Sequence, residues 1–435
     1  MVGVLLALFL PGLIVAVIQA NKGRTDRRVL PIVLGGYLLR LALQFFFRDV
    51  EIFSYGAGGD WAHYEEQASV VSQFWDHGIY KYVTADDFPG LAQTTLPANL
   101  FGFIYFLNGG PTRIGCCSVI AVTACLTCLN LYWLGLEFEV DAKKMFRVFL
   151  VMFFGPAFLL YTSDLYKDGL VLFFVIGSFA STLRLARKFS FGHLAIALLS
   201  SAALFGCRFY LVFVTVAPLL IGLVGIGSKN LTRQILSTLA VLAGLIFVVT
   251  YTRTLGAVNE TVDMAWNTGA STAAITSNAE GGSGVEFNDG GSPMGALHWK
   301  VLYTLLAPFP WMSGSLALQL GKIEALVWYY MLYRAFLASK MLWRENRGML
   351  LMFLSFLIPT TIMYAFIMSN VGLMVRERMG IVYVGYLLGT LSWAPREALG
   401  VIRGKAVAVP PVAPRKRAIA PGRVPRRVPR RAPAA

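Results

Sequence analysis

Charge is scarce in this sequence. Only 14% of the 435 residues are Asp, Glu, Lys or Arg, and the mean hydropathy is +0.63. Because a soluble domain usually has about 25% charged residues, this composition excludes an ordinary soluble protein and predicts an all-α polytopic membrane protein. The first 21 residues contain no charged side chain, and the basic stretch KGRTDRR follows them directly. We interpret them as a retained membrane helix, because they are too long for a signal-peptide core and lack a preceding basic segment.

Cysteine is also rare, with five residues in the chain. Four of them share one apolar segment that contains the sequence CLTC: Cys116, Cys117, Cys125 and Cys128. Since no histidine or further cysteine cluster accompanies them, we expect buried small residues rather than a metal or redox site. The histidines show no metal-binding spacing such as HExxH. No metal site and no definite cofactor are therefore predicted, and a divalent cation held by Asp60, Glu65 or Asp168 stays an open alternative.

Acidic residues are outnumbered, so the net charge is +15, and most of it lies in the tail. Residues 396–435 hold eleven Lys/Arg and one Glu within a Pro/Arg-rich stretch. This composition is typical of a disordered segment held near anionic lipid headgroups. Because the rest of the chain is only mildly basic, we predict a basic cytoplasmic tail and no nucleic-acid partner.

Long apolar runs are abundant. Hydropathy predicts eleven membrane-spanning helices, at residues 2–20, 29–47, 114–134, 147–162, 168–184, 193–206, 209–227, 235–252, 322–339, 349–368 and 378–395. If the N-terminus lies outside, all six basic segments fall on the cytoplasmic side: 22–28, 143–147, 184–188, 229–233, 340–347 and the tail.

This predicted topology places two long acidic loops outside the membrane, at 48–112 and 253–298. Each loop includes an apolar, proline-containing segment, LPANLFGFIYFLN or WKVLYTLLAPFPWMSGSLAL, which we expect to form helices lying at the outer interface. The predicted organisation is two N-terminal transmembrane helices at 1–47, an outer loop with amphipathic helices at 48–112, a transmembrane bundle at 113–252, an outer loop at 253–321, C-terminal transmembrane helices at 322–395 and the tail at 396–435.

Acidic residues gather at the predicted outer face. Asp60, Tyr64 and Gln67 recur at helical spacing, so they share one face of a predicted amphipathic helix. Asp60 can simply cap this helix. A second group lies in the outer turn YTSDLYKDGL: Asp164, Lys167 and Asp168. The charged residues of this turn either form a salt bridge with one another, or they provide a carboxylate and a cation that activate an acceptor hydroxyl near a phosphate.

Three arginines lie at predicted outer helix ends, where positive charge is disfavoured: Arg208, Arg376 and Arg378. Either they snorkel to outer-leaflet headgroups, or they bind a lipid-linked phosphate. Arg40 falls within the second predicted span, where we expect a buried structural pair. Arg334 lies near an inner helix end, where we expect it to snorkel.

Several short segments resemble the GT-C class of membrane glycosyltransferases, which includes protein mannosyltransferases and aminoarabinose transferases. They are GGDWAHYEEQA after an early span, SDLYKDG at a span junction, CRFY, LLAPFPW…KIEALVWYY and SNVGLMVRERMG. The resemblance implies a sugar donor on a polyprenyl phosphate and transfer at the extracytoplasmic face of the plasma (inner) membrane. It implies that Asp60 is the first-loop acid and that the second acid is Asp164 or Asp168. The chain departs from the family pattern by an extra helix before the loop and by a single acid at the Asp60 motif.

The sequence therefore predicts a glycosyltransferase of cell-envelope polysaccharide or glycoconjugate synthesis, with a glycan, lipid or protein acceptor. Its predicted catalytic residues are Asp60, Asp164 and Asp168, and its predicted substrate-binding residues are Tyr64, Lys167, Arg208, His298, Trp311, Glu324, Arg376 and Arg378. The alternatives are a polysaccharide polymerase that uses a lipid-linked oligosaccharide, a lipid or solute transporter, and a non-catalytic assembly subunit. A transporter is less favoured, because Arg40 stands nearly alone near the predicted midplane.

Overall fold

The computed structural model describes residues 1–49, 60–91, 94–224, 284–285, 287, 295–314, 316–366 and 370–400. Within these ranges the regular elements are helices, and an isolated β-bridge joins Gly284 to Asn370. The α-helices are α1 (Val2–Ala20), α2 (Val29–Asp49), α4 (Asp60–Asp76), α5 (Thr95–Asn108), α6 (Arg113–Glu137), α7 (Ala142–Phe153), α8 (Pro156–Tyr161), α9 (Asp168–Arg187), α10 (Phe191–Arg208), α11 (Tyr210–Val224), α15 (Leu297–Leu306), α16 (Leu316–Glu345), α17 (Arg347–Phe366), α18 (Val371–Glu377), α19 (Met379–Leu391) and α20 (Arg396–Leu399). The all-α class is confirmed for the described chain.

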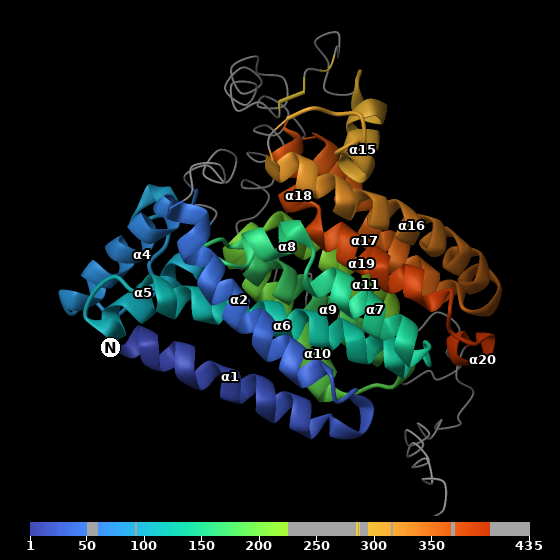
Figure 1. Cartoon of the computed structure of the whole chain (residues 1–435), viewed down its shortest axis with the longest axis horizontal. Helices are drawn as coiled ribbons and strands as arrows, with labels where there is room; N and C mark the ends of the chain where they lie inside the picture. The colour runs from blue at the N-terminus through green and yellow to red at the C-terminus, as the bar shows by residue number, and fades with distance from the viewer. Residues whose placement is uncertain are drawn as a thin grey trace, which may run out of the picture.

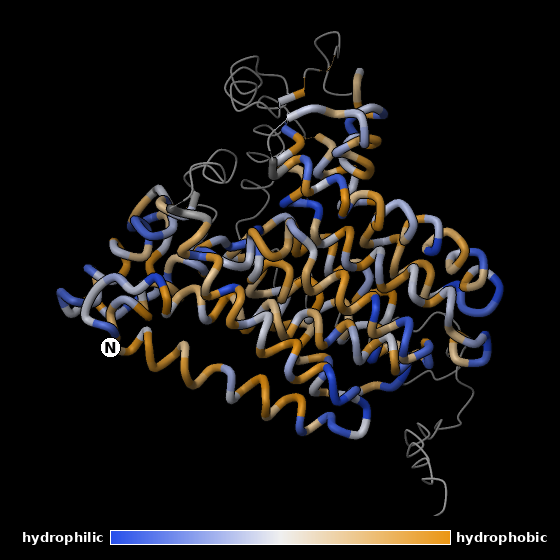
Figure 2. The backbone as a smooth tube through the Cα atoms, viewed as in Figure 1, coloured by the Kyte–Doolittle hydropathy of each residue, from blue (hydrophilic) through white to orange (hydrophobic). Residues whose placement is uncertain are grey.

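Six of the described helices are long and apolar enough to cross a membrane: α1, α2, α6, α9, α10 and α17. Figure 2 shows hydrophobic residues along the whole of α1, which lies at the margin of the bundle. α6 and α9 are instead mostly buried at its centre. These helices support a membrane-embedded protein. The total of eleven spans stays a prediction, and the predicted span at 235–252, most of the loop at 253–298 and the tail beyond Gly400 lie outside the described residues.

The predicted span at 147–162 is not one helix. α7 ends at Phe153, and α8 begins at Pro156 after Gly155. Proline cannot continue a preceding helix, because it lacks an N–H and its ring clashes with the previous turn, but it is favoured at a helix start. The prediction of a continuous span is therefore wrong here. Arg40 is fully buried beside this break, and it donates to the Phe153 carbonyl and the Thr162 hydroxyl, both at 2.8 Å.

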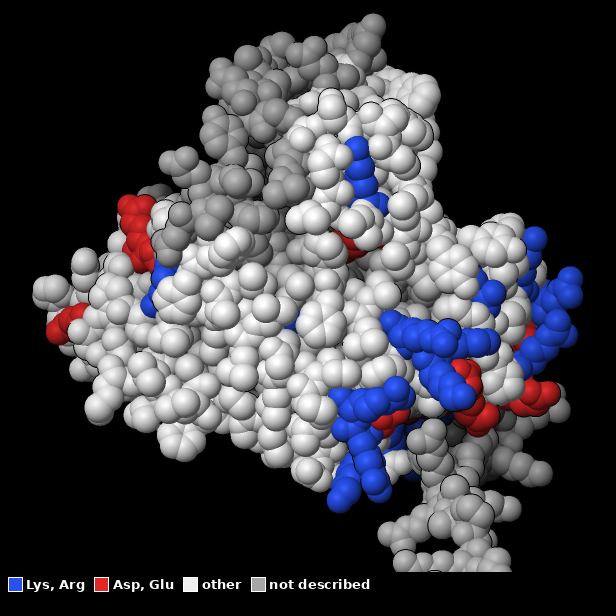
Figure 3. Space-filling model, in the orientation of Figure 1, with Lys and Arg blue, Asp and Glu red and all other residues white. Residues whose placement is uncertain are grey.

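Several of the predicted cytoplasmic segments lie together at one end of the bundle. Arg24 lies 3.7 Å from the Glu137 carboxylate, and Arg184 pairs with the same carboxylate at 2.9 Å. Lys144 lies over the ring of Trp393, with Nζ 5.6 Å from the ring centroid. Figure 3 shows Lys and Arg gathered at this end of the molecule. We call it the basic end.

The opposite end carries the turn between α8 and α9, together with α4, α5, α15 and α18 (Figure 1). The two predicted interfacial segments form α5 and α15, and the second helix ends at Leu306, just before Pro308. α5 is joined to the end of α10 by the Thr95 hydroxyl, which donates to the Gly206 carbonyl at 3.3 Å. Most of the predicted site residues of the described chain therefore lie on elements of this end.

Candidate functional site

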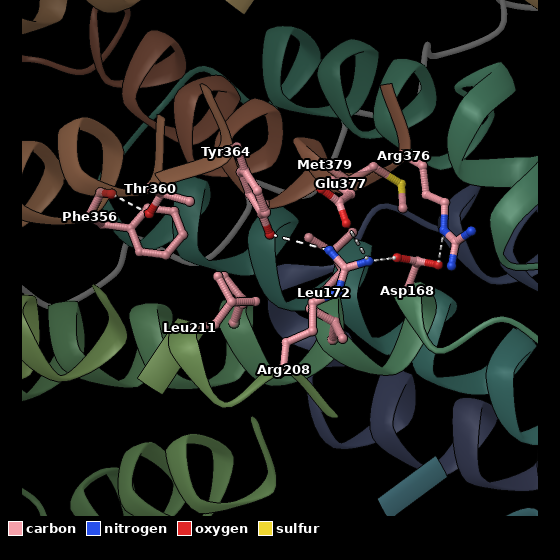
Figure 4. Close-up of a pocket in the computed structure, with 13 residues that line it drawn as sticks. Asp168, Leu172, Arg208, Leu211, Phe356, Thr360, Tyr364, Arg376, Glu377 and Met379 are labelled. Atoms are coloured by element: carbon pink, nitrogen blue, oxygen red, sulfur yellow. Dashed lines mark hydrogen bonds and ion pairs between the residues drawn. The ribbon is translucent and has the colours of Figure 1, made fainter. Parts of the chain in front are cut away.

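Asp168 is the centre of a buried ion-pair network. It is the first residue of α9, where the helix dipole favours a carboxylate, and it is 2% exposed. Arg208, the last residue of α10, donates to its Oδ1 at 2.8 Å. Arg376, from α18, donates to its Oδ2 at 2.5 Å. Figure 4 shows the carboxylate held between the two guanidiniums. Residues far apart in the sequence thus meet at one helix start.

Each guanidinium has further partners. Arg208 Nη2 lies 3.4 Å from the Glu377 carboxylate, and its Nη1 donates to the Tyr364 hydroxyl at 3.4 Å. Arg376 lies against two aromatic rings in the turn before α9. Its Cζ is 5.5 Å from the Tyr161 ring centroid and 5.3 Å from the Tyr166 ring centroid. Cation–π attraction, which is strong where water is excluded, helps to fix Arg376, and the polar contacts with Glu377 and Tyr364 help to fix Arg208.

Lys167 adds a third cation directly before α9. Its side chain is 8% exposed. Burial and the neighbouring Arg208 lower its pKa from 10.5 to about 8, although Asp168 opposes the shift. We call Lys167, Asp168, Arg208, Arg376 and Glu377 the α9 cluster. It has three cations and two carboxylates.

The alternative that the arginines snorkel to headgroups is wrong. Arg208, Arg376 and Arg378 are 4%, 7% and 4% exposed, whereas a snorkelling side chain holds its charge in water. The cavity that Asp168 and Arg208 line has a volume of only about 10 Å³, which is the space of one water molecule. The cluster is closely packed in this structure.

Arg378 and Glu324 lie in a neighbouring arrangement. Arg378, between α18 and α19, donates to the Thr304 carbonyl of α15 at 3.1 Å. The Glu324 carboxylate attracts this guanidinium. Glu324 accepts a hydrogen bond from the Ala157 N–H at 3.0 Å and so caps the start of α8. Both residues have a structural role in positioning helices around the α9 cluster.

Asp164 is buried in the same turn, at 3% exposure. Its Oδ1 accepts from the Leu165 N–H at 2.7 Å and lies 3.8 Å from Cys117 Sγ. The interpretation of the turn as a self-contained salt bridge is incomplete, because Asp168 pairs with α10 and α18 instead of only with its neighbours.

The other predicted site residues do not join the α9 cluster in the described contacts. α4 begins at Asp60, whose side chain lies outside the described residues. Tyr64 is buried at 4% exposure within the core. His298 is exposed on α15 and lies beside Trp299. Trp311 is 79% exposed and stacks on Phe309.

Sequence reasoning missed several residues of the site. Glu377 lies between the two predicted arginines in the sequence RER. An acidic residue between two predicted phosphate-binding arginines could have identified it as a site residue. Tyr364 and the ring pair of Tyr161 and Tyr166 gave no such signal, since aromatic residues are common at membrane interfaces. The four cysteines of α6 are buried, as predicted, and Cys207 is buried as well. Among the described residues, no three His, Cys, Asp or Glu side chains form a group that could hold a metal ion.

No family model, no curated protein and no solved structure matches this chain.

Proposed function

We propose that this protein is an integral membrane glycosyltransferase that moves a sugar from a polyprenyl-phosphate-linked donor to an acceptor hydroxyl, outside the plasma membrane, in cell-envelope glycan synthesis. The observation that carries the proposal is the α9 cluster, in which three buried cations face two carboxylates. Guanidinium and ammonium groups are the usual protein ligands of phosphate oxygens, so the cluster is suited to an anionic ligand. The resemblance of the surrounding segments to GT-C enzymes suggests that this anion is a lipid-linked phosphate.

In the proposed reaction, the acceptor oxygen forms a bond to the anomeric carbon while the bond from that carbon to the donor phosphate oxygen breaks. Polyprenyl phosphate leaves as an anion, and Arg208, Arg376 and Lys167 stabilise its charge. No strong general acid is then needed. The acceptor proton passes to a carboxylate, and the anomeric configuration is inverted. The cavity of about 10 Å³ beside the cluster is too small for a phosphate, so this scheme requires the surrounding side chains to move apart when the donor binds.

The structure changes the roles proposed for the acids. Both Asp168 oxygens are paired with guanidiniums, so Asp168 is a poor proton acceptor and acts as a positioning residue for the arginines. We assign the general base to Asp60, at the start of α4. Asp164, in the turn before α9, orients the acceptor in this scheme.

Donor binding can be tested with farnesyl phosphate, a short polyprenyl phosphate, by calorimetry on the purified protein. Arg376→Lys keeps the charge but removes the planar fork and the stacking on two tyrosines. We expect the affinity to fall at least about tenfold, as for the loss of a charged hydrogen bond. The matched control is Arg344→Lys, which changes an exposed arginine on α16 near the basic end. Equal, wild-type affinity in both variants would reject the phosphate site.

Catalysis is tested separately with Asp60→Asn, which keeps the capping ability of the side chain. Farnesyl phosphate affinity should stay at the wild-type value. Release of sugar from the polyprenyl-phosphate donors of isolated membranes should fall about 10²–10⁴-fold, which is typical for loss of a general base. Normal turnover in this variant would show that Asp60 is only a helix cap.

A further inference from the structure

A second and larger cavity lies near the basic end of the bundle, between α7, α16 and α19. Its volume is about 520 Å³, which lies within the range of small-molecule sites. α19 packs against both α7 and α16 and so forms its floor. Lys144 and Arg147 of α7 line it together with apolar residues such as Val151 and Val327. We call this cavity the α7–α16 groove.

Cations stand at one end of the groove. Lys144 and Arg147 are exposed and one helical turn apart, so they share a face of α7. Lys144 Nζ lies 5.6 Å from the centroid of the Trp393 ring, which also lines the groove, and Arg334 lies over the same ring at 4.7 Å. Asp141 is the acid at the start of α7, and its carboxylate is used to cap the helix at the Lys144 N–H. Tryptophan beside cations is typical of the headgroup level of a membrane.

Tyr386 supplies an independent observation deeper in the groove. The residue lines the cavity and is 2% exposed, yet its hydroxyl has no hydrogen-bond partner among the described residues. A buried hydroxyl without a partner is destabilising and calls for an acceptor. Tyr386 precedes Leu391, the last residue of α19, by five residues, so it lies about 7–8 Å along the helix axis from the end that carries Trp393.

We infer that the α7–α16 groove binds one anionic glycerophospholipid of the adjacent leaflet. Its phosphate contacts Lys144 and Arg147, and an ester oxygen of its glycerol accepts a hydrogen bond from Tyr386. An acyl chain lies against Val151 and Val327. Basic pockets between transmembrane helices are known to take such headgroups. Polyprenyl phosphate is a poorer match, because it has no ester oxygen at the depth of Tyr386. This site is separate from the α9 cluster and does not depend on the proposed sugar transfer.

The test is native mass spectrometry of the full chain, purified in detergent and supplied with equal amounts of phosphatidylglycerol and phosphatidylcholine. Wild type should retain one phosphatidylglycerol. Replacing both Lys144 and Arg147 by Gln should lower retention about thirtyfold, as expected for two headgroup-level cations. Tyr386→Phe should lower it about fivefold through one lost hydrogen bond, and Val151→Trp should block it by filling the groove. Lys143→Gln, which removes an exposed charge next to Lys144 that does not line the groove, is the control.

Three results would overturn the inference. Equal loss in Lys143→Gln and in the double variant would show only general attraction of lipid to a basic surface. Unchanged retention in both Val151→Trp and Tyr386→Phe would place the lipid elsewhere. Displacement of phosphatidylglycerol by an equal amount of farnesyl phosphate would also reject the assigned occupant, and would instead identify the groove as a site for the donor lipid.

Discussion

If the α9 cluster binds the donor phosphate as proposed, Lys167 should set the pH range of that binding. Its pKa is lowered to about 8, first by burial and then by Arg208. A phosphate monoester has lost its second proton above about pH 6–7, so the charge of farnesyl phosphate is constant at higher pH. The Lys167 ammonium is present below its pKa and is lost as the pH rises through it. Farnesyl phosphate affinity should therefore be highest near neutral pH and should fall between about pH 7 and 9.5.

Calorimetric titrations across this range check the prediction. Lys167→Arg is the informative comparison, because a guanidinium stays protonated throughout and the affinity should no longer depend on pH. An equally flat profile in the wild type would show that Lys167 does not contact the anion.

At the residue scale, the sequence indicated which charged residues to examine, but it did not indicate which residues they pair with. Arg208 and Arg376 could be identified because cations are disfavoured at predicted outer helix ends. Their convergence on Asp168 could not be predicted, since Asp168 and Arg376 are separated by 208 positions. Glu377 was overlooked although it adjoins Arg376 in the sequence. Which acid is paired and which is available for chemistry depends on this tertiary packing.

At the scale of elements, the close approach of α9 to α6 fixes where Asp168 lies. A Cβ on Gly169 would come within 2.9 Å of Ile120 Cγ2, on α6, and within 3.2 Å of Thr162 Cγ2, in the preceding turn. Gly169→Ala should therefore displace the start of α9. We expect a loss of about 1–3 kcal/mol of stability, as for other overpacked cores, and weaker binding of farnesyl phosphate.

Thermal unfolding in detergent and the same binding assay measure both effects. Gly35→Ala is the matched control, because a Cβ at Gly35 of α2 would meet nothing within 4 Å. That substitution should be neutral or slightly stabilising, since alanine is the better helix former. If Gly169→Ala behaved like Gly35→Ala, the helix start would have room to spare and the packing argument would fail.

The helices also show where hydropathy alone fails to predict helix boundaries. It predicted the cores of α1, α2, α6, α9, α10 and α17 within a few residues, because each is a continuous apolar run. It missed the division of residues 147–162 at Gly155 and Pro156, because the apolar character continues across the break. Arg40 was the missed signal, since a buried guanidinium needs acceptors and an interrupted helix exposes carbonyls.

At the scale of the whole molecule, the fold class followed from composition, but the arrangement did not. Scarce charge and long apolar runs are enough to predict a helical membrane protein. They do not determine which helices are neighbours, and so they could not reveal the α7–α16 groove. Its lining comes from three helices that are distant in the sequence. Some of the predicted cytoplasmic segments contact one another at one end of the bundle, and the side of the membrane that this end faces stays a prediction.

Orientation in the membrane is the last prediction. Because basic loops are retained in the cytoplasm, the basic end should face inward and the α9 cluster outward. All five native cysteines are buried, so an impermeant maleimide should give little background in intact cells. Tyr80→Cys places a thiol at a site that is 73% exposed after α4, and Lys143→Cys places one on exposed α7 at the basic end. Only the first variant should be labelled before lysis, and both should be labelled after it. The reverse pattern would place the α9 cluster on the cytoplasmic side, and a lipid-linked donor would then have to reach it from the inner leaflet. That result would reject the proposal of sugar transfer at the extracytoplasmic face.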